Sequence, residues 1–381
     1  MKNINHEKLL RGEYEAQAFP ADFSAESPVP DYAFNLINFQ NSLYRPFVDE
    51  FHIKKGMPKL KWPGGKPFAV CLSHDVDAVS LASLAQAIRK RYLRWKTAGD
   101  LNERFLLSLG IGEDLLRALH HAGKPDPLFC LERWLAIERN IDAHSTFFFW
   151  PGWEAVSKRH TSDCTYRLSD QIVFEGQACS VAEAIREMSR RGWEIGLHAS
   201  WYSFNDADEL RRQKDALENA VQQEVVSIRQ HYLHYDIRIT PKIQAQAGFK
   251  YDSTLGFNDN VGFRFGTCIP WSLWEMESEK ELSIVEVPLI VQDTALLDNT
   301  KGMRLDEDTA FRYIQHLAEQ VEAVGGVITL SWHPEYIVRP MWWRLYARSL
   351  QFFKKRNAYM GGMKEIMTIL KRPSATENCP T

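Results

Sequence analysis

The feature that most constrains the fold of this chain is a repeated alternation of short apolar runs with longer amphipathic stretches. The run FAVCLS at 68–73 shows little polar alternation, which is typical of a strand buried on both faces. The stretch SVAEAIREMSRRG at 180–192 has apolar residues at i, i+3 and i+4 and ends in glycine, which predicts a helix. Strands that alternate with helices indicate parallel strands joined by crossovers, and therefore an α/β fold built as an (incomplete) barrel. Strands are predicted at 68–73, 143–150, 193–198, 224–230, 282–291 and 326–333.

The rest of the 381-residue chain is arranged around this predicted barrel. Residues 1–65 are proline-rich and weakly periodic, so we expect an irregular N-terminal arm that packs on the barrel. The barrel is expected over 66–371, with a helical insertion at about 80–125. The last residues, 372–381, have the composition of a disordered tail.

Composition and charge argue against several classes of protein. A hydrophobic content of 45%, a charged content of 25% and a formal net charge of −3 are ordinary for a globular protein and give no argument for a nucleic-acid partner. The start MKNINHEKLL lacks the apolar core of a signal peptide, and no window approaches 18 apolar residues, so we expect a cytoplasmic protein without a transmembrane segment. The six cysteines form no CxxC or Cys/His zinc motif. Nothing in the sequence indicates the oligomeric state.

Ionisable side chains follow several predicted strands at the point where each strand ends. In parallel α/β folds these carboxyl ends meet at one rim, where ligands and catalytic groups sit. Each residue taken alone has a plainer interpretation, because an Asp after a strand often caps a helix and a single His is usually structural. Their recurrence at equivalent positions favours a shared site. The side chains concerned are Asp75, Asp77, His198, Arg229, His231 and His333.

Residues of these types can hydrolyse an acyl bond without a covalent intermediate. One Asp with two imidazoles is a ligand set for Zn²⁺ or a similar divalent ion, which lowers the pKa of a bound water from about 15.7 to about 7. A second Asp can accept a proton as general base, a His can donate one to the leaving group, and an Arg can fix the base. GxSxG, P-loop and GxGxxG motifs are missing from suitable contexts, which counts against serine hydrolases, kinases and dehydrogenases.

Six ordered motifs carry a more specific resemblance. The segments SHDVD, STFFFW, EIGLHAS, RQHYL, GFKYDSTLGF and LSWHP, spread over about 66–335, resemble the polysaccharide deacetylase family (the NodB-homology domain, carbohydrate esterase family 4). The match is closest to a cytoplasmic bacterial branch associated with surface-polysaccharide gene clusters. The resemblance implies a distorted, seven-stranded TIM-like (β/α) barrel and metal-dependent removal of acetyl groups from N-acetylated sugars.

The resemblance also implies a role for each matching residue. Asp75 corresponds to the catalytic base, and Asp77 to the metal-binding aspartate. His198 matches the first histidine of the family's H-x-x-x-H metal motif. Arg229 matches the arginine that positions the base, and His333 the histidine that acts as general acid. The metal implied is most often Zn²⁺, with Co²⁺, Mn²⁺ and Fe²⁺ as alternatives.

One position departs from the family pattern. Where the second histidine of the H-x-x-x-H motif is expected, this chain has Tyr202. His231, beside Arg229 on the neighbouring strand end, is the candidate to replace it, with substrate contact and a structural role as alternatives. We expect His74 to hydrogen-bond a metal ligand or the base.

Several further residues are candidates for contacts with the substrate or with the site residues. The backbone amide near Tyr232 is expected to help hold the developing oxyanion. Asp252 is a candidate substrate or arginine contact, or a turn residue, and Arg264 either grips an anionic sugar group or forms an ion pair. Glu286 and Asp293 are alternatives for the acidic residue that tunes the general-acid histidine.

The leading hypothesis from the sequence is a metal-dependent carbohydrate N-deacetylase. Its substrate would be a nucleotide-linked or lipid-linked N-acylated sugar used in bacterial surface-polysaccharide (lipopolysaccharide, O-antigen or capsule) biosynthesis. A second hypothesis is an amidohydrolase or deformylase that acts on a small non-carbohydrate or formylated substrate, as relatives resembling allantoinase and sugar deformylases do. A third, motivated by Tyr202, is a sugar-binding relative whose hydrolytic site has decayed.

Overall fold

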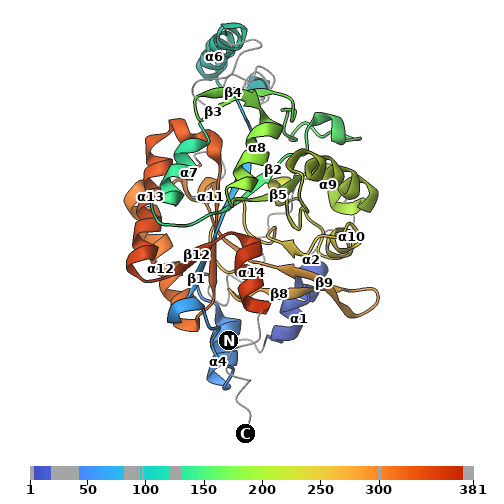
Figure 1. Ribbon diagram of the computed structural model, residues 1–381, viewed down its shortest axis with the longest axis vertical. Helices are drawn as coiled ribbons and strands as arrows, with labels where there is room; N and C mark the ends of the chain where they lie inside the picture. Colours follow the sequence, from blue (N-terminus) through green and yellow to red (C-terminus); the bar gives the residue numbers. More distant parts are fainter. Residues whose placement is uncertain are drawn as a thin grey trace.

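The computed structural model describes residues 4–18, 43–80, 92, 95–96, 98–120, 130–298 and 302–371, and it contains one curled, mostly parallel sheet (Figure 1). The order of its strands is β10-β11-β1-β2-β5-β6-β7-β9-β8, and β12 also pairs with β1. The β8–β9 pair is antiparallel, and the other pairs of the sheet are parallel. The strands are β1 (Ala69–Val76), β2 (Thr146–Phe149), β5 (Glu194–Ala199), β6 (Ser227–Gln230), β7 (Tyr251–Asp252), β8 (Trp271–Glu275), β9 (Lys280–Glu286), β10 (Leu289–Gln292), β11 (Val327–Trp332) and β12 (Tyr359–Gly361).

The predicted strand at 282–291 is in fact two strands, and this split explains how the sheet curls. Pro288 interrupts the run, and proline cannot donate a hydrogen bond within a strand. The part before it, β9, pairs with β7, whereas the part after it, β10, pairs with β11. Two adjacent stretches of chain therefore lie near opposite ends of the strand order. The result is the distorted α/β barrel that the sequence predicts.

Helices cover the outer face of the sheet (Figure 1). In that view α7, α12 and α13 lie on one side, and α8, α9 and α10 lie on the other. Ser180 and Glu183 form a capping box at the start of α8, and Asp206 and Asp306 cap the next two long helices, as their residue types favour. The main-domain helices are α7 (Glu132–Arg139), α8 (Val181–Arg190), α9 (Ala207–Val221), α10 (Thr240–Gln246), α11 (Asp293–Leu297), α12 (Glu307–Val324), α13 (Pro340–Lys355) and α14 (Met363–Lys371).

Two further parts lie outside the barrel sheet. A small antiparallel hairpin, β3 (Gln171–Phe174) with β4 (Gln177–Ser180), precedes α8. Within the predicted insertion, α6 (Leu101–His120) projects at one end of the molecule, beyond this hairpin (Figure 1). Much of 81–97 and all of 121–129 lie outside the described residues, as does the predicted tail at 372–381.

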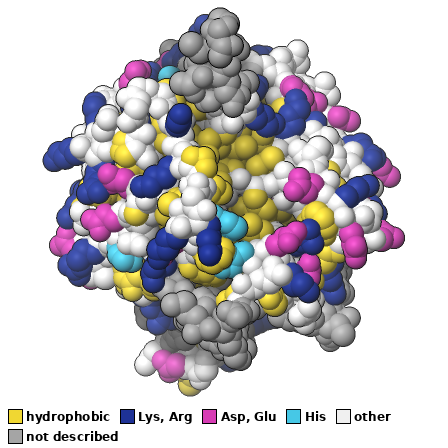
Figure 2. Space-filling view, turned by 90° about the horizontal axis from the view of Figure 1, so that it is seen from below, with side chains coloured by type: hydrophobic (Ala, Val, Ile, Leu, Met, Phe, Trp, Pro, Cys, Tyr) yellow, Lys and Arg dark blue, Asp and Glu magenta, His cyan; other side chains and the backbone are white. Residues whose placement is uncertain are grey.

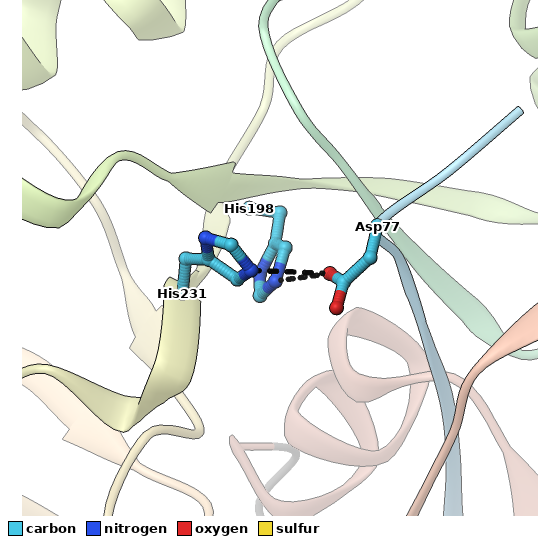
Figure 3. Close-up of side chains that lie close together, drawn as sticks. All are labelled: Asp77, His198 and His231. Atoms are coloured by element: carbon cyan, nitrogen blue, oxygen red, sulfur yellow. Dashed lines mark ion pairs between the residues drawn. The ribbon is translucent and has the colours of Figure 1, made fainter. Parts of the chain in front are cut away.

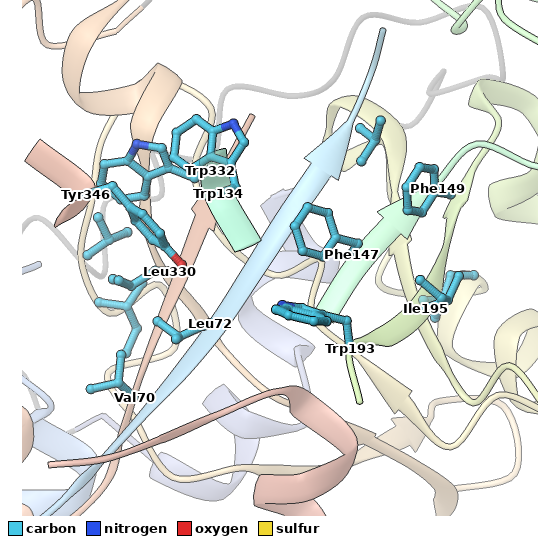
Figure 4. Close-up of a cluster of buried hydrophobic side chains, with 14 of the residues drawn as sticks. Val70, Leu72, Trp134, Phe147, Phe149, Trp193, Ile195, Leu330, Trp332 and Tyr346 are labelled. Carbon is cyan, nitrogen blue, oxygen red and sulfur yellow. The ribbon is translucent and has the colours of Figure 1, made fainter. Parts of the chain in front are cut away.

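Side-chain alternation along β1 separates the hydrophobic core from the interior of the barrel. Val70 and Leu72 point outward into the large core beneath the helices, together with Leu330 and Trp332 of β11 (Figure 4). Cys71, on the opposite face, belongs to a second apolar cluster inside the barrel. The strand is buried on both faces along its whole length, as its unbroken apolar pattern predicts.

Inside the barrel, one glycine makes room for an aromatic ring. Gly196 of β5 lies opposite Phe148 of β2, and a Cβ atom at residue 196 would stand 2.6 Å from the Phe148 ring. The same ring lies 4.4 Å from the guanidinium carbon of Arg229 on β6. The glycine therefore allows the aromatic side chain to fill the interior and to contact the arginine above it.

The described parts of the N-terminal arm are attached to the barrel by buried polar contacts. They include three short helices, α1 (His6–Leu10), α2 (Glu13–Ala18) and α4 (Phe47–Lys54), so these parts are more regular than predicted. Asp49 accepts hydrogen bonds from the Thr267 hydroxyl at 2.6 Å and from the Cys268 amide at 2.7 Å. Trp62 donates its indole N–H to the carbonyl of Gly325 at 3.0 Å.

Charged side chains of both signs are mixed on one face of the molecule (Figure 2). On the face drawn in Figure 2, Lys and Arg side chains are interspersed with Asp and Glu, and hydrophobic side chains gather near its centre beside histidines. Within the described ranges, none of the helices combines the length and the apolar character needed to cross a bilayer.

The arm contact at Asp49 predicts a pH-dependent contribution to stability. Burial raises the pKa of Asp49 to about 6, above its ordinary value of 3.8, so the folded state holds this proton more tightly than the unfolded state. Its contribution to stability should therefore be present below about pH 4 and be lost as the pH rises through about 6. Asp49→Asn removes this titration. The free energy of unfolding of the variant minus that of wild type should therefore rise by about 2 kcal/mol when the pH is raised from 4.5 to 7.5. Urea unfolding at both pH values measures the difference, and an equal wild-type-to-variant difference at the two values would contradict the assignment.

Candidate metal centre and catalytic site

Three side chains from neighbouring strand ends converge on a possible metal site (Figure 3). Asp77 follows β1, His198 lies in β5, and His231 opens the short helix η5 (His231–Leu233) after β6. One ligand atom from each lies within 4.8 Å of the others. The Asp77 Oδ1 atom is 3.1 Å from His198 Nε2 and 3.5 Å from His231 Nε2. One carboxylate with two imidazoles suits Zn²⁺ and similar first-row divalent ions.

The two histidines are oriented with the same ring nitrogen toward the carboxylate. His198 Nδ1 lies 3.1 Å from the carbonyl oxygen of Arg229, which fixes the ring and leaves Nε2 facing Asp77. Burial would lower the pKa of His231, but the Asp77 carboxylate raises it to about 9. Both imidazoles are almost fully buried, whereas the Asp77 side chain is 28% exposed. These residues therefore fit a cation that is reached from the Asp77 side.

Asp75, two residues before Asp77, is held by Arg229. Arg229 Nη1 donates to Asp75 Oδ1 at 2.7 Å, and both side chains are buried. Burial alone would raise the pKa of Asp75, but the arginine beside it brings that pKa below its ordinary value. Asp75 therefore stays ionised beside Arg229, two residues from the candidate ligand Asp77.

His333, just after β11, faces the second carboxylate oxygen of Asp77, whereas His198 and His231 face the first. The Nδ1 atom of His333 lies 2.6 Å from Asp293 Oδ1, and its backbone N–H donates to Asp293 Oδ2 at 2.8 Å. Its Nε2 faces the cluster, 3.9 Å from Asp77 Oδ2. Burial would lower the pKa of His333, but Asp293 raises it well above its ordinary value, so this imidazole is suited to carry a proton. Of the two acidic candidates, Asp293 contacts the histidine.

No family model and no curated protein matches the sequence, but solved structures do match the fold. One is a protein assigned as a polysaccharide deacetylase from Mycobacterium smegmatis, with a TM-score of 0.53, 21% identity, and coverage of 85% of this chain and 98% of that chain. Another, assigned the same activity, comes from Pseudomonas aeruginosa PAO1, with a TM-score of 0.50, 16% identity, and coverage of 84% and 95%. The allantoinase Puue has a TM-score of 0.50, 15% identity, and coverage of 85% and 96%.

The chain has the polysaccharide deacetylase fold. The match covers nearly the whole length of those two chains, 98% and 95%, and about 85% of this chain. The structural match shows the fold, and sequence identities of 21% and 16% are too low to transfer an activity.

Within this deacetylase fold, Tyr202 does not join the metal cluster. It lies in the short helix η4 (Trp201–Asn205), which begins two residues after β5 ends. Its ring contacts the ammonium group of Lys158 at 3.9 Å and lies 5.7 Å from the ring of His160. The cluster instead receives its second imidazole from His231, on the neighbouring strand end.

Asp163 is a buried carboxylate near the site that the sequence analysis missed. Its Oδ1 atom lies 3.9 Å from His231 Nδ1 and accepts the backbone N–H of Trp201 at 2.7 Å. Its Oδ2 atom accepts the backbone N–H of His160 at 2.7 Å. The residue lies in a loop outside any predicted strand or helix, so no sequence pattern marks it.

His74 does not contact a ligand or the base, contrary to the prediction. Because it is adjacent to Asp75 in a strand, it points to the opposite face. There its Nε2 lies 2.7 Å from Glu138 Oε1, and its Nδ1 lies 3.1 Å from the carbonyl of Trp332. Glu138 also accepts the Tyr346 hydroxyl at 2.9 Å, so the histidine belongs to a buried structural network.

Two candidate substrate residues are also placed elsewhere. Arg264 is 1% exposed at its side chain and forms an ion pair with Glu15 of the arm, which corresponds to the ion-pair alternative. Asp252 is fully buried and lies in register with Glu286, where the Thr254 hydroxyl donates to it. Burial raises the pKa of Asp252 to about 6, and burial together with the nearby Asp252 charge raises that of Glu286 well above its ordinary value. Neither Arg264 nor Asp252 is therefore available to bind substrate.

Tyr232 is exposed beside the metal cluster and has an unusual backbone. Its φ is 58°, and that of the next residue, Leu233, is 53°, so two consecutive non-glycine residues are left-handed. Such conformations cost about 1–2 kcal/mol per residue and tend to occur at functional sites. The Tyr232 ring is 38% exposed and lies 4.6 Å from the ring of His231.

The metal centre predicts zinc binding that depends on His231. In His231→Ala the cluster loses one of its three ligands, and we expect Zn²⁺ affinity to fall by more than about tenfold. Calorimetric titration of chelator-treated protein with Zn²⁺ measures the change. His316→Ala, which removes an exposed imidazole on α12, should leave affinity unchanged. Equal affinities of wild type and His231→Ala would exclude His231 as a ligand.

Proposed function

We propose that this protein is a metal-dependent hydrolase that removes the N-acetyl group from a sugar. The observation that carries the proposal is that an ionised carboxylate and a proton-bearing imidazole lie near the same candidate metal cluster. Asp75, two residues before Asp77, is paired with Arg229, whereas His333, 3.9 Å from Asp77, is paired with Asp293. The deacetylase fold shared with two solved structures adds support.

The residues of the chain divide the reaction between them. Asp77, His198 and His231 would hold a divalent ion, for which the donor set favours Zn²⁺, and the ion would supply Lewis-acid activation of water and of the amide carbonyl. The Asp75 carboxylate accepts a proton from the attacking water as the new C–O bond forms. His333 Nε2 donates a proton to the amide nitrogen as the C–N bond breaks, so that acetate and the free amino sugar are released. Arg229 and Asp293 hold these two groups in their required protonation states.

We extend the proposal to the class of substrate. The resemblance of the sequence motifs to the surface-polysaccharide branch favours a cytoplasmic location and a nucleotide-linked or lipid-linked N-acetyl sugar as substrate. The exposed Tyr232 ring beside the cluster offers a surface on which a sugar ring can stack. The backbone amide near Tyr232 would face the carbonyl oxygen of the acyl group.

A second candidate function is hydrolysis of a small non-carbohydrate amide. It is favoured by the likeness of the fold to an allantoinase, which matches over nearly the same share of the chain as the deacetylases do. The same base, acid and metal ligands would serve either reaction. Incubating zinc-loaded protein with UDP-linked and lipid-linked N-acetyl sugars and with allantoin, and then measuring acetate, formate, ammonia and the ring-opened acid of allantoin, distinguishes the two. Acetate release supports the deacetylase, whereas ring opening of allantoin, or formate or ammonia release, without acetate overturns it.

Replacing the base predicts a loss of catalysis without a loss of metal. In Asp75→Asn we expect acetate release to slow by about 10²–10⁴-fold, because the proton acceptor is removed. Zinc affinity should stay within about threefold, since Asp75 is bonded to Arg229 and lies outside the ligand cluster. Asp208→Asn, at a carboxylate that is 84% exposed, is the control and should behave as wild type. Acetate release at the wild-type rate by Asp75→Asn would overturn the assigned base.

Replacing Tyr232 by glycine predicts opposite effects on stability and on substrate binding. Glycine adopts a φ near 58° without strain, so Tyr232→Gly should be as stable as wild type or more stable by up to about 1 kcal/mol. Loss of the ring should nevertheless raise KM for the sugar substrate by about tenfold. Gln222→Gly relieves a similar left-handed residue at the exposed end of α9, and it should gain stability with no change in KM. An unchanged KM in Tyr232→Gly would exclude the ring as a sugar contact.

A further inference from the structure

We propose that Asp163 is the positioning residue that makes His231 a metal ligand in place of a histidine at residue 202. This inference rests on the metal centre of the proposed function and deepens it. It starts from the two nitrogens of the His231 ring, which lie on opposite sides. Nε2 faces Asp77 Oδ1 at 3.5 Å, and Nδ1 faces Asp163 Oδ1 at 3.9 Å.

The His231 ring has a buried nitrogen that needs a partner. The residue is 4% exposed, and its Nδ1 atom makes no hydrogen bond in the part of the chain that the structure describes. A histidine that binds a metal through Nε2 carries its proton on Nδ1, and that proton is normally given to a carboxylate, a carbonyl or water. Asp163 supplies a carboxylate oxygen on that side, 3.9 Å from Nδ1.

Asp163 is itself held in place by the backbone. Its two oxygens accept the N–H groups of Trp201 and His160, each at 2.7 Å, and the residue is 4% exposed. The Trp201 ring is stacked between two imidazoles, His160 at 4.2 Å and His234 at 4.0 Å. A carboxylate anchored at both oxygens can fix the orientation of a neighbouring ring.

The same contacts connect Asp163 with Tyr202, which stands where the family pattern has its second histidine. Trp201 directly precedes Tyr202, so the bond from its amide to Asp163 fixes the start of η4, where the family's second histidine would stand. The two ligand histidines then have matching arrangements. His198 gives its Nδ1 side to the Arg229 carbonyl, and His231 gives its Nδ1 side to the Asp163 carboxylate.

A double-mutant cycle separates positioning of His231 from a structural role of the loop. The variants are Asp163→Asn, His231→Ala and the double variant, each titrated with Zn²⁺ and with Co²⁺ as a visible-absorption probe. We expect Asp163→Asn alone to weaken Zn²⁺ binding by about 10–100-fold and to alter the Co²⁺ spectrum. In the His231→Ala background it should cause no further loss, because the ring that it positions is absent.

A structural role predicts a different pattern, and a matched carboxylate checks it. If Asp163 only closes the loop, Asp163→Asn should lower the melting temperature of metal-free protein and weaken Zn²⁺ equally in both backgrounds, which overturns the proposal. Asp306→Asn removes a carboxylate that caps α12 by accepting the Thr309 amide at 2.9 Å, and it should change stability without changing the Co²⁺ spectrum. These readouts need no substrate. If wild type binds zinc but releases no acetate, the deacetylase proposal fails and the positioning proposal stands. If Asp163→Asn binds zinc with wild-type affinity, the positioning proposal fails and the deacetylase proposal is unaffected. Absence of zinc binding by wild type overturns both.

Discussion

Arg229 is the residue on which both the barrel interior and the site depend. A buried guanidinium is costly unless its donors are satisfied, and here they reach Asp75, the Ser253 carbonyl, and the hydroxyls of Ser73, Ser253 and Ser331. Small polar residues therefore occupy the inward positions of the strands around it. Breaking such a buried pair by removing one partner typically costs about 3–5 kcal/mol, because the other charge is left uncompensated.

The backbone of Arg229 is as important as its side chain. Its carbonyl oxygen fixes the ring of His198, and the chain reaches His231 two residues later. One stretch of β6 and η5 thus holds Asp75, orients one candidate ligand and supplies another. A shift of β6 against β5, whose register pairs His198 with Arg229, would disturb Asp75 and the candidate metal cluster together. Phe148 and Gly196, packed below the guanidinium, help to hold that register.

The sequence predicts those parts of the site that follow from strand ends, and it fails where contacts join distant loops. Asp75, Asp77, His198 and His333 could be grouped because parallel strands end at one rim. The position of His74 could also have been predicted, since alternation in a strand separates it from Asp75. Nothing local could show that Arg264 meets Glu15, because 249 residues separate them.

Two further features needed the structure for different reasons. The split of 282–291 at Pro288 has a local signal, but which sides of the sheet the two halves join depends on how the barrel curls. The choice between Glu286 and Asp293 has no local signal, because the two acidic residues lie on either side of the same apolar run at 287–291. Glu286 lies next to Asp252, and Asp293 begins α11 beneath His333, so the tertiary fold alone decides between them.

The distribution of charge explains why the cluster around Asp77 suits an exchangeable cation. Asp75 faces Arg229, a partner whose charge is permanent. Asp77 instead faces imidazoles, with His198 at 3.1 Å, His231 at 3.5 Å and His333 at 3.9 Å. An imidazole can release its proton and become a ligand, which a guanidinium cannot do. The same carboxylate can therefore be balanced by protons on His231 and His333, whose pKa values Asp77 helps to raise, or by a divalent ion in their place. Substituting one ligand histidine by another on the next strand preserves this exchange, whereas tyrosine at residue 202, with its far higher ordinary pKa, would not take part in it near neutral pH.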